Sequence, residues 1–182
     1  MKKILCLLAT VAALGVARAA DENFTITLDT AQVVGPNKTP ARAGSGDGVM
    51  VLKDNNTLTY TINYTGLPEA RKGVVIYGPA PAGSTAGALY VITSPSETGT
   101  GNGTLQGTIS LVAGRGGYSL AQQRSQLLLS QWYVGFSTAT YPATSGDMDL
   151  RGQISYNVIP EPGTWSLLTL GLAGMALRLR KK

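Results

Sequence analysis

The sequence contains no histidine, and its one cysteine, Cys6, lies in the first apolar run. Histidine is the usual general base near neutral pH, the commonest zinc or copper ligand and the centre of a Ser-His-Asp triad. Carboxylates alone do not build a copper redox site. These absences argue against a dismutase-type metal enzyme, and we expect a protein that is not an enzyme and that holds no metal and no cofactor.

The middle of the chain also lacks a large net charge, although the whole sequence carries +5. Between Ala20 and Pro160 there are eight basic and nine acidic residues, which leaves a net charge of −1. The cations at the two ends are Lys2, Lys3, Arg18, Arg178, Arg180, Lys181 and Lys182. No basic stripe interleaved with aromatic residues occurs in the middle, so nucleic-acid binding is not expected.

The first residues have the layout of a secretory signal peptide. Lys2 and Lys3 form a positive tip, an apolar stretch runs over 4–16, and Ala17 and Ala19 place small residues at the positions that a signal peptidase reads. We predict a signal peptide over 1–19, Sec-type export and cleavage by signal peptidase after Ala19. A buried N-terminal helix is the alternative.

The middle of the chain alternates polar and apolar residues in the pattern of half-buried strands. The segments "NFTITLD" and "LTYTINYT" both have period two and are rich in β-branched and aromatic residues. Asp54, Asn55 and Asn56 favour a turn, which predicts a hairpin of strands near 48–53 and 57–65. The further predicted strands are 73–77, 87–93, 103–112, 131–139 and 149–158.

One segment has the features of a helix instead. Ser119 followed by Gln122 fits a capping box, which predicts a short helix over 120–129. Gln123 and Arg124 are expected to face away from the core. The residues expected to face the core are Leu120, Leu127 and Leu128.

These elements predict an all-β fold, an antiparallel Greek-key β-sandwich with one short helix at its end. The predicted domain covers 20–159, which is long enough to bury a core. It contains no cysteine, so the domain depends on its packing and not on disulfides.

The end of the chain combines a proline bracket, a short apolar run and a basic tip. Pro160-Glu161-Pro162 interrupts any regular element. As a helix, the uncharged run from Trp165 to Leu177 is about 20 Å long, which is short of the roughly 30 Å hydrocarbon core. The basic tip prefers the cytoplasmic side of a membrane. We expect a short transmembrane helix that acts as a temporary stop.

This tail resembles the PEP-CTERM sorting signal in Pro160-Glu161-Pro162, in the apolar run and in the tip from Arg178 to Lys182. The resemblance covers 160–182. It implies a membrane-embedded exosortase that recognises the proline motif and removes the tail. It also implies a Gram-negative-type envelope and, commonly, a cell that makes exopolysaccharide.

The segment from Phe24 to Ile154 resembles the CHRD domain, a module named after chordin and frequent in exported bacterial proteins. The resemblance is carried by "FTITLDTAQVV", "LTYTINYTGL", "VVIYGPAPAG", "LLLSQWYVGFSTATYP" and "DLRGQI". It implies a Greek-key sandwich like that of superoxide dismutase. Relatives usually carry histidines in an Ala-His-Ile-His and an Asn-(Val/Ile)-His-Thr segment. Here Val75, Tyr77 and Ser137 occupy those positions, which implies that any metal or ligand chemistry of the histidines is lost.

Two further groups of residues have weaker signals for a site. Asp147 and Asp149 point the same way if residues 147–149 are extended. This pair could contribute to a calcium site or flank a glycosidic bond. A solvated strand end beside Arg151 is the favoured interpretation. Trp132 and Tyr133 are expected in the core, with stacking on a sugar as the alternative.

The sequence therefore predicts an exported, exosortase-sorted, non-catalytic protein of the cell surface or the exopolysaccharide matrix. A module that binds a glycan or a protein through loops at one end of the sandwich is the alternative. A row of exposed aromatic residues would favour binding, whereas a surface of Thr, Asn and Gly would favour a matrix role. The expected location is the inner membrane and then the cell envelope, the surface or the extracellular matrix.

Overall fold

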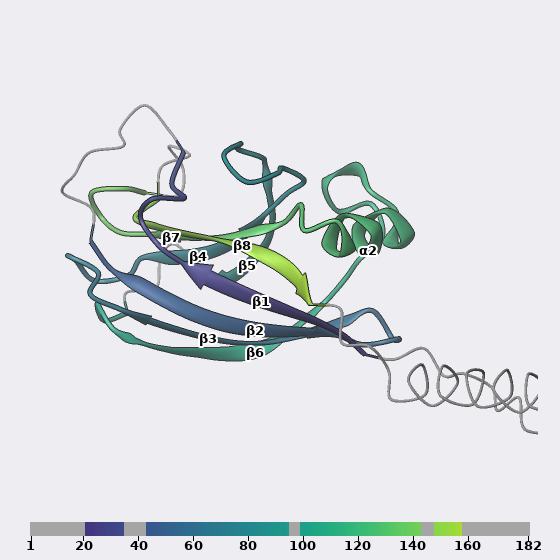
Figure 1. Ribbon diagram of the computed structural model, residues 1–182, viewed down its shortest axis with the longest axis horizontal. Coiled ribbons are helices and arrows are strands. Elements are labelled where there is room, and N and C mark those ends of the chain that lie inside the picture. Colours follow the sequence, from purple (N-terminus) through teal and green to yellow (C-terminus); the bar gives the residue numbers. More distant parts are fainter. Residues whose placement is uncertain (1–20, 35–42, 95–98, 143–147, 158–182) are drawn as a thin grey trace, which may run out of the picture.

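The computed structural model describes residues 21–34, 43–94, 99–142 and 148–157 (Figure 1). The predicted signal peptide with Ala19, the proline motif and the short apolar run with its basic tip all lie outside these residues. Within the described part of the chain, no helix is long and apolar enough to cross a membrane.

The described residues form eight strands, a 3-10 helix and an α-helix. The strands are β1 (Glu22–Leu28), β2 (Ser45–Leu52), β3 (Thr57–Thr65), β4 (Gly73–Tyr77), β5 (Ala88–Thr93), β6 (Gly103–Ser110), β7 (Tyr133–Ser137) and β8 (Leu150–Asn157). The helices are η1 (Arg115–Gly117) and α2 (Leu120–Leu128). Every predicted strand is present, with ends that differ from the prediction by a few residues, and all strand pairs are antiparallel.

The strands form one continuous sheet in the order β5-β4-β7-β8-β1-β2-β3-β6, folded over into two layers (Figure 1). β8 joins the layers, because its first half pairs with β7 and its second half pairs with β1. The chain crosses between the layers at β3–β4, β5–β6 and β6–β7, as Greek-key connections do. The predicted antiparallel fold with one helix is confirmed. Its shape is close to a barrel that remains open between the edge strands β5 and β6.

The main core lies between the layers and follows the predicted alternation. Phe24, Ile26 and Leu28 on β1 are 1%, 2% and 1% exposed, while Thr25 and Thr27 face outward. β4 and β7 are buried along their whole lengths, because both of their faces are covered. One face of these two strands belongs to the main core, and the other belongs to a separate apolar cluster.

The helix α2 begins at the predicted capping box. The Ser119 hydroxyl accepts a hydrogen bond from the Gln122 N–H, and the Gln122 side chain accepts one from the Ser119 N–H. The prediction that Gln123 faces away is wrong, since Gln123 is 0% exposed. It accepts a bond from the Tyr90 hydroxyl at 2.6 Å and donates to two backbone carbonyls. Burial of this amide is tolerated because its polar groups are paired.

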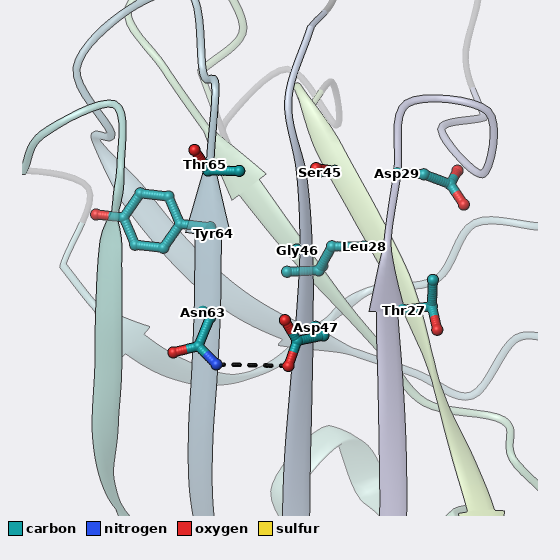
Figure 2. A pocket seen from close by; sticks show the side chains of 9 residues that line it. All are labelled: Thr27, Leu28, Asp29, Ser45, Gly46, Asp47, Asn63, Tyr64 and Thr65. Atoms are coloured by element: carbon teal, nitrogen blue, oxygen red, sulfur yellow. Dashed lines mark hydrogen bonds between the residues drawn. The ribbon is translucent and has the colours of Figure 1, made fainter.

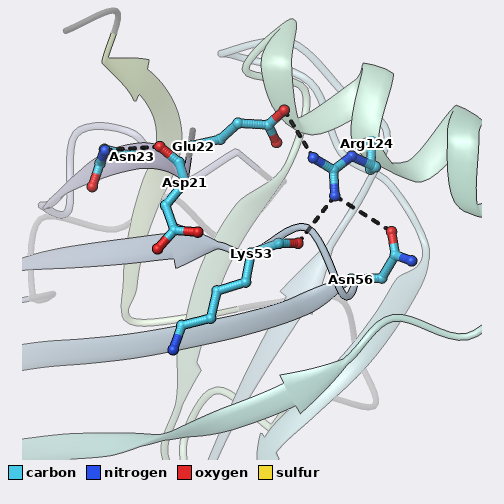
Figure 3. A network of polar contacts seen from close by, with 6 residues as sticks. All are labelled: Asp21, Glu22, Asn23, Lys53, Asn56 and Arg124. Atoms are coloured by element: carbon cyan, nitrogen blue, oxygen red, sulfur yellow. Dashed lines mark hydrogen bonds and ion pairs between the residues drawn. The ribbon is translucent and has the colours of Figure 1, made fainter. Parts of the chain in front are cut away.

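Arg124 attaches α2 to the predicted hairpin of β2 and β3 (Figure 3). Its guanidinium donates to the Lys53 carbonyl at 3.1 Å and to the Asn56 side chain at 3.4 Å. It also pairs with the Glu22 carboxylate at 3.0 Å. Asn56 has a φ of 61°, a left-handed conformation that asparagine tolerates well, which is why the turn forms here.

Candidate functional site

The three positions where histidines were expected come together on one face of β4 and β7. In the β4–β7 ladder, Val75 lies opposite Gly135 and Tyr77 lies opposite Tyr133. Ser137 lies opposite Gly73, one step further along the same face. Alternate residues of a strand share a face, so Val75, Tyr77 and Ser137 all point outward from the main core. The sequence positions singled out by the resemblance are therefore neighbours in space.

This face is covered by packed apolar side chains, which we name the outer cluster. Its buried members are Val33, Val75, Tyr77, Ala80, Tyr133 and Met148. The rings of Tyr77 and Tyr133 stack with centroids 5.1 Å apart and an interplanar angle of 11°. Burial raises the pKa of Tyr77 to about 12. A Cβ at Gly135 would lie 2.9 Å from both the Tyr77 ring and the Met148 sulfur, so only glycine leaves them room.

Ser137 occupies the third position at which a histidine was expected, and it is 2% exposed. Its hydroxyl donates to the Gly73 carbonyl at 3.1 Å. The side chains of Val75 and Tyr77 offer apolar surface and a phenol of raised pKa, neither of which suits a metal ion. In the part of the chain that the structure describes, no group of three or more His, Cys, Asp or Glu residues could hold a metal ion. The residues at the histidine positions therefore do not fit a metal site.

Arg151 lies beside the outer cluster and is buried, with 1% exposure. Its guanidinium carbon lies 3.6 Å from the centroid of the Tyr133 ring, and it donates to the Ser84 carbonyl at 2.6 Å. Burial lowers the pKa of the Arg151 guanidinium. The expected solvated strand end is wrong, because Asp149 is 0% exposed as well. Asp147, the other half of the carboxylate pair, lies outside the described residues.

Gln153 continues this polar arrangement two residues further along β8. Its side chain accepts a bond from Arg151 at 3.2 Å and donates to the carbonyls of Ala80 and Ser130. The Arg-x-Gln pattern thus ties the loop 78–87 and the end of α2 to the sheet. Sequence reasoning missed this arrangement. The only signal for it was the segment "DLRGQI", which places the two residues on one strand face.

The aromatic residues proposed for sugar stacking are in the core, as predicted. Trp132 and Tyr133 are 0% and 1% exposed, and the Trp132 indole N–H donates to the Gln126 side chain at 2.9 Å. Every aromatic side chain in the described residues is buried or half-buried. No row of exposed aromatic residues therefore occurs in this part of the chain.

A separate pocket of about 410 Å³ lies where β1, β2 and β3 end together (Figure 2). It is lined by Thr27, Leu28, Asp29, Ser45, Gly46, Asp47, Asn63, Tyr64 and Thr65. Only glycine fits at position 46 in this lining, because a Cβ there would lie 2.9 Å from the Leu28 side chain and 2.3 Å from the Asn63 backbone oxygen.

The polar groups of this pocket are partly engaged with each other. The Asn63 amide donates to the Asp47 carboxylate at 3.4 Å (Figure 2). The Asp29 carboxylate accepts bonds from the backbone and the side chain of Gln32, at 2.7 Å and 2.9 Å. Sequence reasoning missed the pocket, because its lining comes from three strands whose alignment no local pattern reveals.

The comparisons with known families find two matches. The family model described as the CHRD domain matches residues 24–154. The PEP-CTERM protein-sorting motif matches residues 158–181. No curated protein and no solved structure matches the chain.

Proposed function

The chain belongs to the CHRD domain family, and we propose that it is a non-catalytic protein of the cell surface or of the exopolysaccharide matrix. The PEP-CTERM motif implies export, processing by an exosortase and association with the membrane or cell envelope of a Gram-negative bacterium. We further propose that the domain catalyses nothing and that it associates with exopolysaccharide.

The observation that carries the non-catalytic assignment is the outer cluster. At the three positions where histidines were expected, this chain has Val75, Tyr77 and Ser137, and all three are less than a tenth exposed. The first two are packed with other apolar side chains, and the third is hydrogen-bonded to the backbone. A general base or a metal ligand must reach a reacting group, and these side chains instead hold the β4–β7 face to its covering loops.

The matrix assignment is supported by the outer face of the layer β1-β2-β3-β6. This face is rich in threonine and nearly uncharged. One row of directly paired residues across the four strands consists of Thr25, Val49, Thr61 and Gln106. Hydroxyl groups of this kind both donate and accept hydrogen bonds, which suits contact with a hydrated neutral polysaccharide. The lack of exposed aromatic residues among those that the structure describes favours this role over a stacking site for a single sugar.

The pocket in Figure 2 favours a second candidate, a module that binds a glycan. It combines buried Leu28 with polar groups from Asp47 and Asn63, and sites for small ligands commonly combine apolar surface with a few polar groups. Asp47→Asn would weaken binding of the cell's own exopolysaccharide, measured by co-sedimentation, whereas Asp54→Asn in the distant turn would not. Equal binding by both variants would count against the pocket.

The delivery part of the proposal is tested by the masses of the two terminal peptides of the protein from native envelopes. We expect an N-terminus at Ala20 and a C-terminus near Pro160-Glu161-Pro162, because signal peptidase and exosortase each remove one end. An intact tip from Arg178 to Lys182 would contradict removal of the tail. It would indicate that the apolar run stays as a membrane anchor.

The non-catalytic matrix role is tested separately by deleting the gene for this chain. Extracted exopolysaccharide should lose material strength, measured by rheology, while its sugar composition and chain length stay unchanged. A change in composition or chain length would indicate an enzymatic role and overturn the proposal.

A further inference from the structure

β6 ends the sheet, and no strand is hydrogen-bonded to its other side (Figure 1). It pairs with β3 from Gly103 to Ser110 without any shift of register. The N–H of Leu111, just beyond the strand, donates to the Asn56 carbonyl at 2.9 Å. Hydrogen-bonded pairs alternate along an antiparallel ladder, so the odd-numbered residues of β6 turn their peptide groups to β3. The residues whose peptide groups face the open side are Thr104, Gln106, Thr108 and Ser110.

This edge lacks the devices that usually block strand addition. Native edge strands are commonly protected by lysine, proline or a bulge. The other edge strand, β5, has two register shifts in its pairing with β4. β6 has no shift, and the sequence from Gly99 to Gly114 contains no charged residue and no proline.

The core beneath this edge is also less completely covered than elsewhere. Leu105 and Ile109 of β6 are only half-buried although they pack against the main core, and so is Ile92 on the opposite edge strand β5. In the closed part of the sheet, Met50 is 0% exposed. A strand added beside β6 would bring apolar side chains over Leu105 and Ile109 and would satisfy the open peptide groups.

We propose that β6 is a self-association edge, at which the β6 strands of two copies pair antiparallel about a two-fold axis. A two-fold axis places this strand opposite itself, so a charge near the axis would face the same charge of the other copy. The uncharged sequence of β6 removes that repulsion, and its outward threonine, glutamine and serine side chains can bond across the axis. The small net charge between Ala20 and Pro160 adds little repulsion between copies.

The pairing is tested by disulfide cross-linking of the protein in native envelopes. Cys6 precedes the predicted cleavage after Ala19, so the mature chain offers a background without cysteine. Single substitutions Thr104→Cys, Gln106→Cys and Thr108→Cys are compared with Thr25→Cys, which lies on the same face and in the same row as Gln106, three strands inward. At least one β6 variant should give a homodimer under mild oxidation, because paired strands bring Cα atoms within disulfide reach. Thr25→Cys should stay monomeric.

A second measurement does not require a disulfide. Gln106→Lys places like charges near each other across the axis and should raise the dimer dissociation constant about tenfold or more in sedimentation experiments. Thr25→Lys adds the same charge away from the edge and should leave the constant unchanged. A wild-type protein that stays monomeric, equal cross-linking of Thr25→Cys, or a cross-link only to a different protein would each overturn the proposal.

Discussion

At the scale of single residues, the chain replaces expected histidines with side chains that pack. Val75 and Tyr77 alternate with Val74 and Ile76 along β4, so one strand serves two apolar clusters. Tyr77 stacks on Tyr133, which in turn lies against the Arg151 guanidinium. These contacts make the outer cluster a structural unit, and ionisation of Tyr77 should affect the pH dependence of stability.

Tyr77 should make the folded state less stable at high pH. Burial raises its pKa from 10.0 to about 12, so the folded state keeps a proton that the unfolded chain loses in this range. Stability is therefore full below about pH 10 and falls as the pH rises through the folded pKa, by about 2 to 3 kcal/mol at most. Urea unfolding at about pH 8 and about pH 11.5 measures this loss.

The control for that measurement is Tyr77→Phe, which keeps the ring stack and removes the ionisable group. Tyr60, whose pKa burial also raises, is present in both proteins, so its effect cancels in the comparison. Tyr77→Phe should lose less stability between the two pH values. An equal loss in both proteins would show that Tyr77 is not protected from ionisation in the fold.

At the scale of elements, α2 is held by polar contacts on two sides. Gln123 bonds to β5 through the Tyr90 hydroxyl and to the loop after β6 through the Val112 carbonyl. Arg124 connects the helix to the start of β1 and to the β2–β3 turn. The helix therefore combines a buried apolar side chain, Leu127, with buried polar contacts, and this is why its periodicity alone misplaced Gln123.

Arg124→Ala should destabilise the folded protein by about 1 to 2 kcal/mol. The variant loses the hydrogen bonds to Lys53 and Asn56 and a partly exposed ion pair with Glu22, whose own contribution is small. Arg124→Lys keeps the charge but cannot reach all three groups, so its loss should be intermediate. Urea midpoints measure both. If Arg124→Ala matched the wild type, these contacts would not be what holds α2.

At the scale of the whole molecule, the sheet is closed on one side and open on the other. β8 joins the layers on the closed side, where Ile154 is 0% exposed. The open side lies between β5 and β6, where Ile92 is only half-buried. An isoleucine side chain should therefore contribute more to stability at position 154 than at position 92.

Ile154→Ala should cost about 3 to 4 kcal/mol of unfolding free energy, because it leaves a cavity in a fully enclosed core. Ile92→Ala removes the same atoms at the open side and should cost about 1 kcal/mol, since less surface was buried there. Denaturant unfolding under the same conditions compares the two. Equal losses would indicate that the open side is covered in solution, as pairing of β6 with a second copy partly would do.

Much of the fold could be predicted because its signals are local. The alternation in "NFTITLD", the turn at Asp54 to Asn56 and the capping box of Ser119 and Gln122 each act within a few residues, and all three are confirmed. The two family resemblances were likewise carried by short segments, and both are confirmed by the matches over 24–154 and 158–181. The cleavage site and the domain limits 20 and 159 stay predictions.

The rest was decided by contacts between distant segments. The sequence alone determined that no histidine is present, but only the register of β4 with β7 brings Val75, Tyr77 and Ser137 to one covered face. Polar and charged side chains are usually exposed. Distant loops and strands nevertheless bury three of them here, Gln123, Asp149 and Arg151. Strand periodicity is encoded in each segment, whereas burial of a strand's second face depends on what packs over it. Which of these second faces is buried is therefore decided only when distant segments of the chain pack over the sheet.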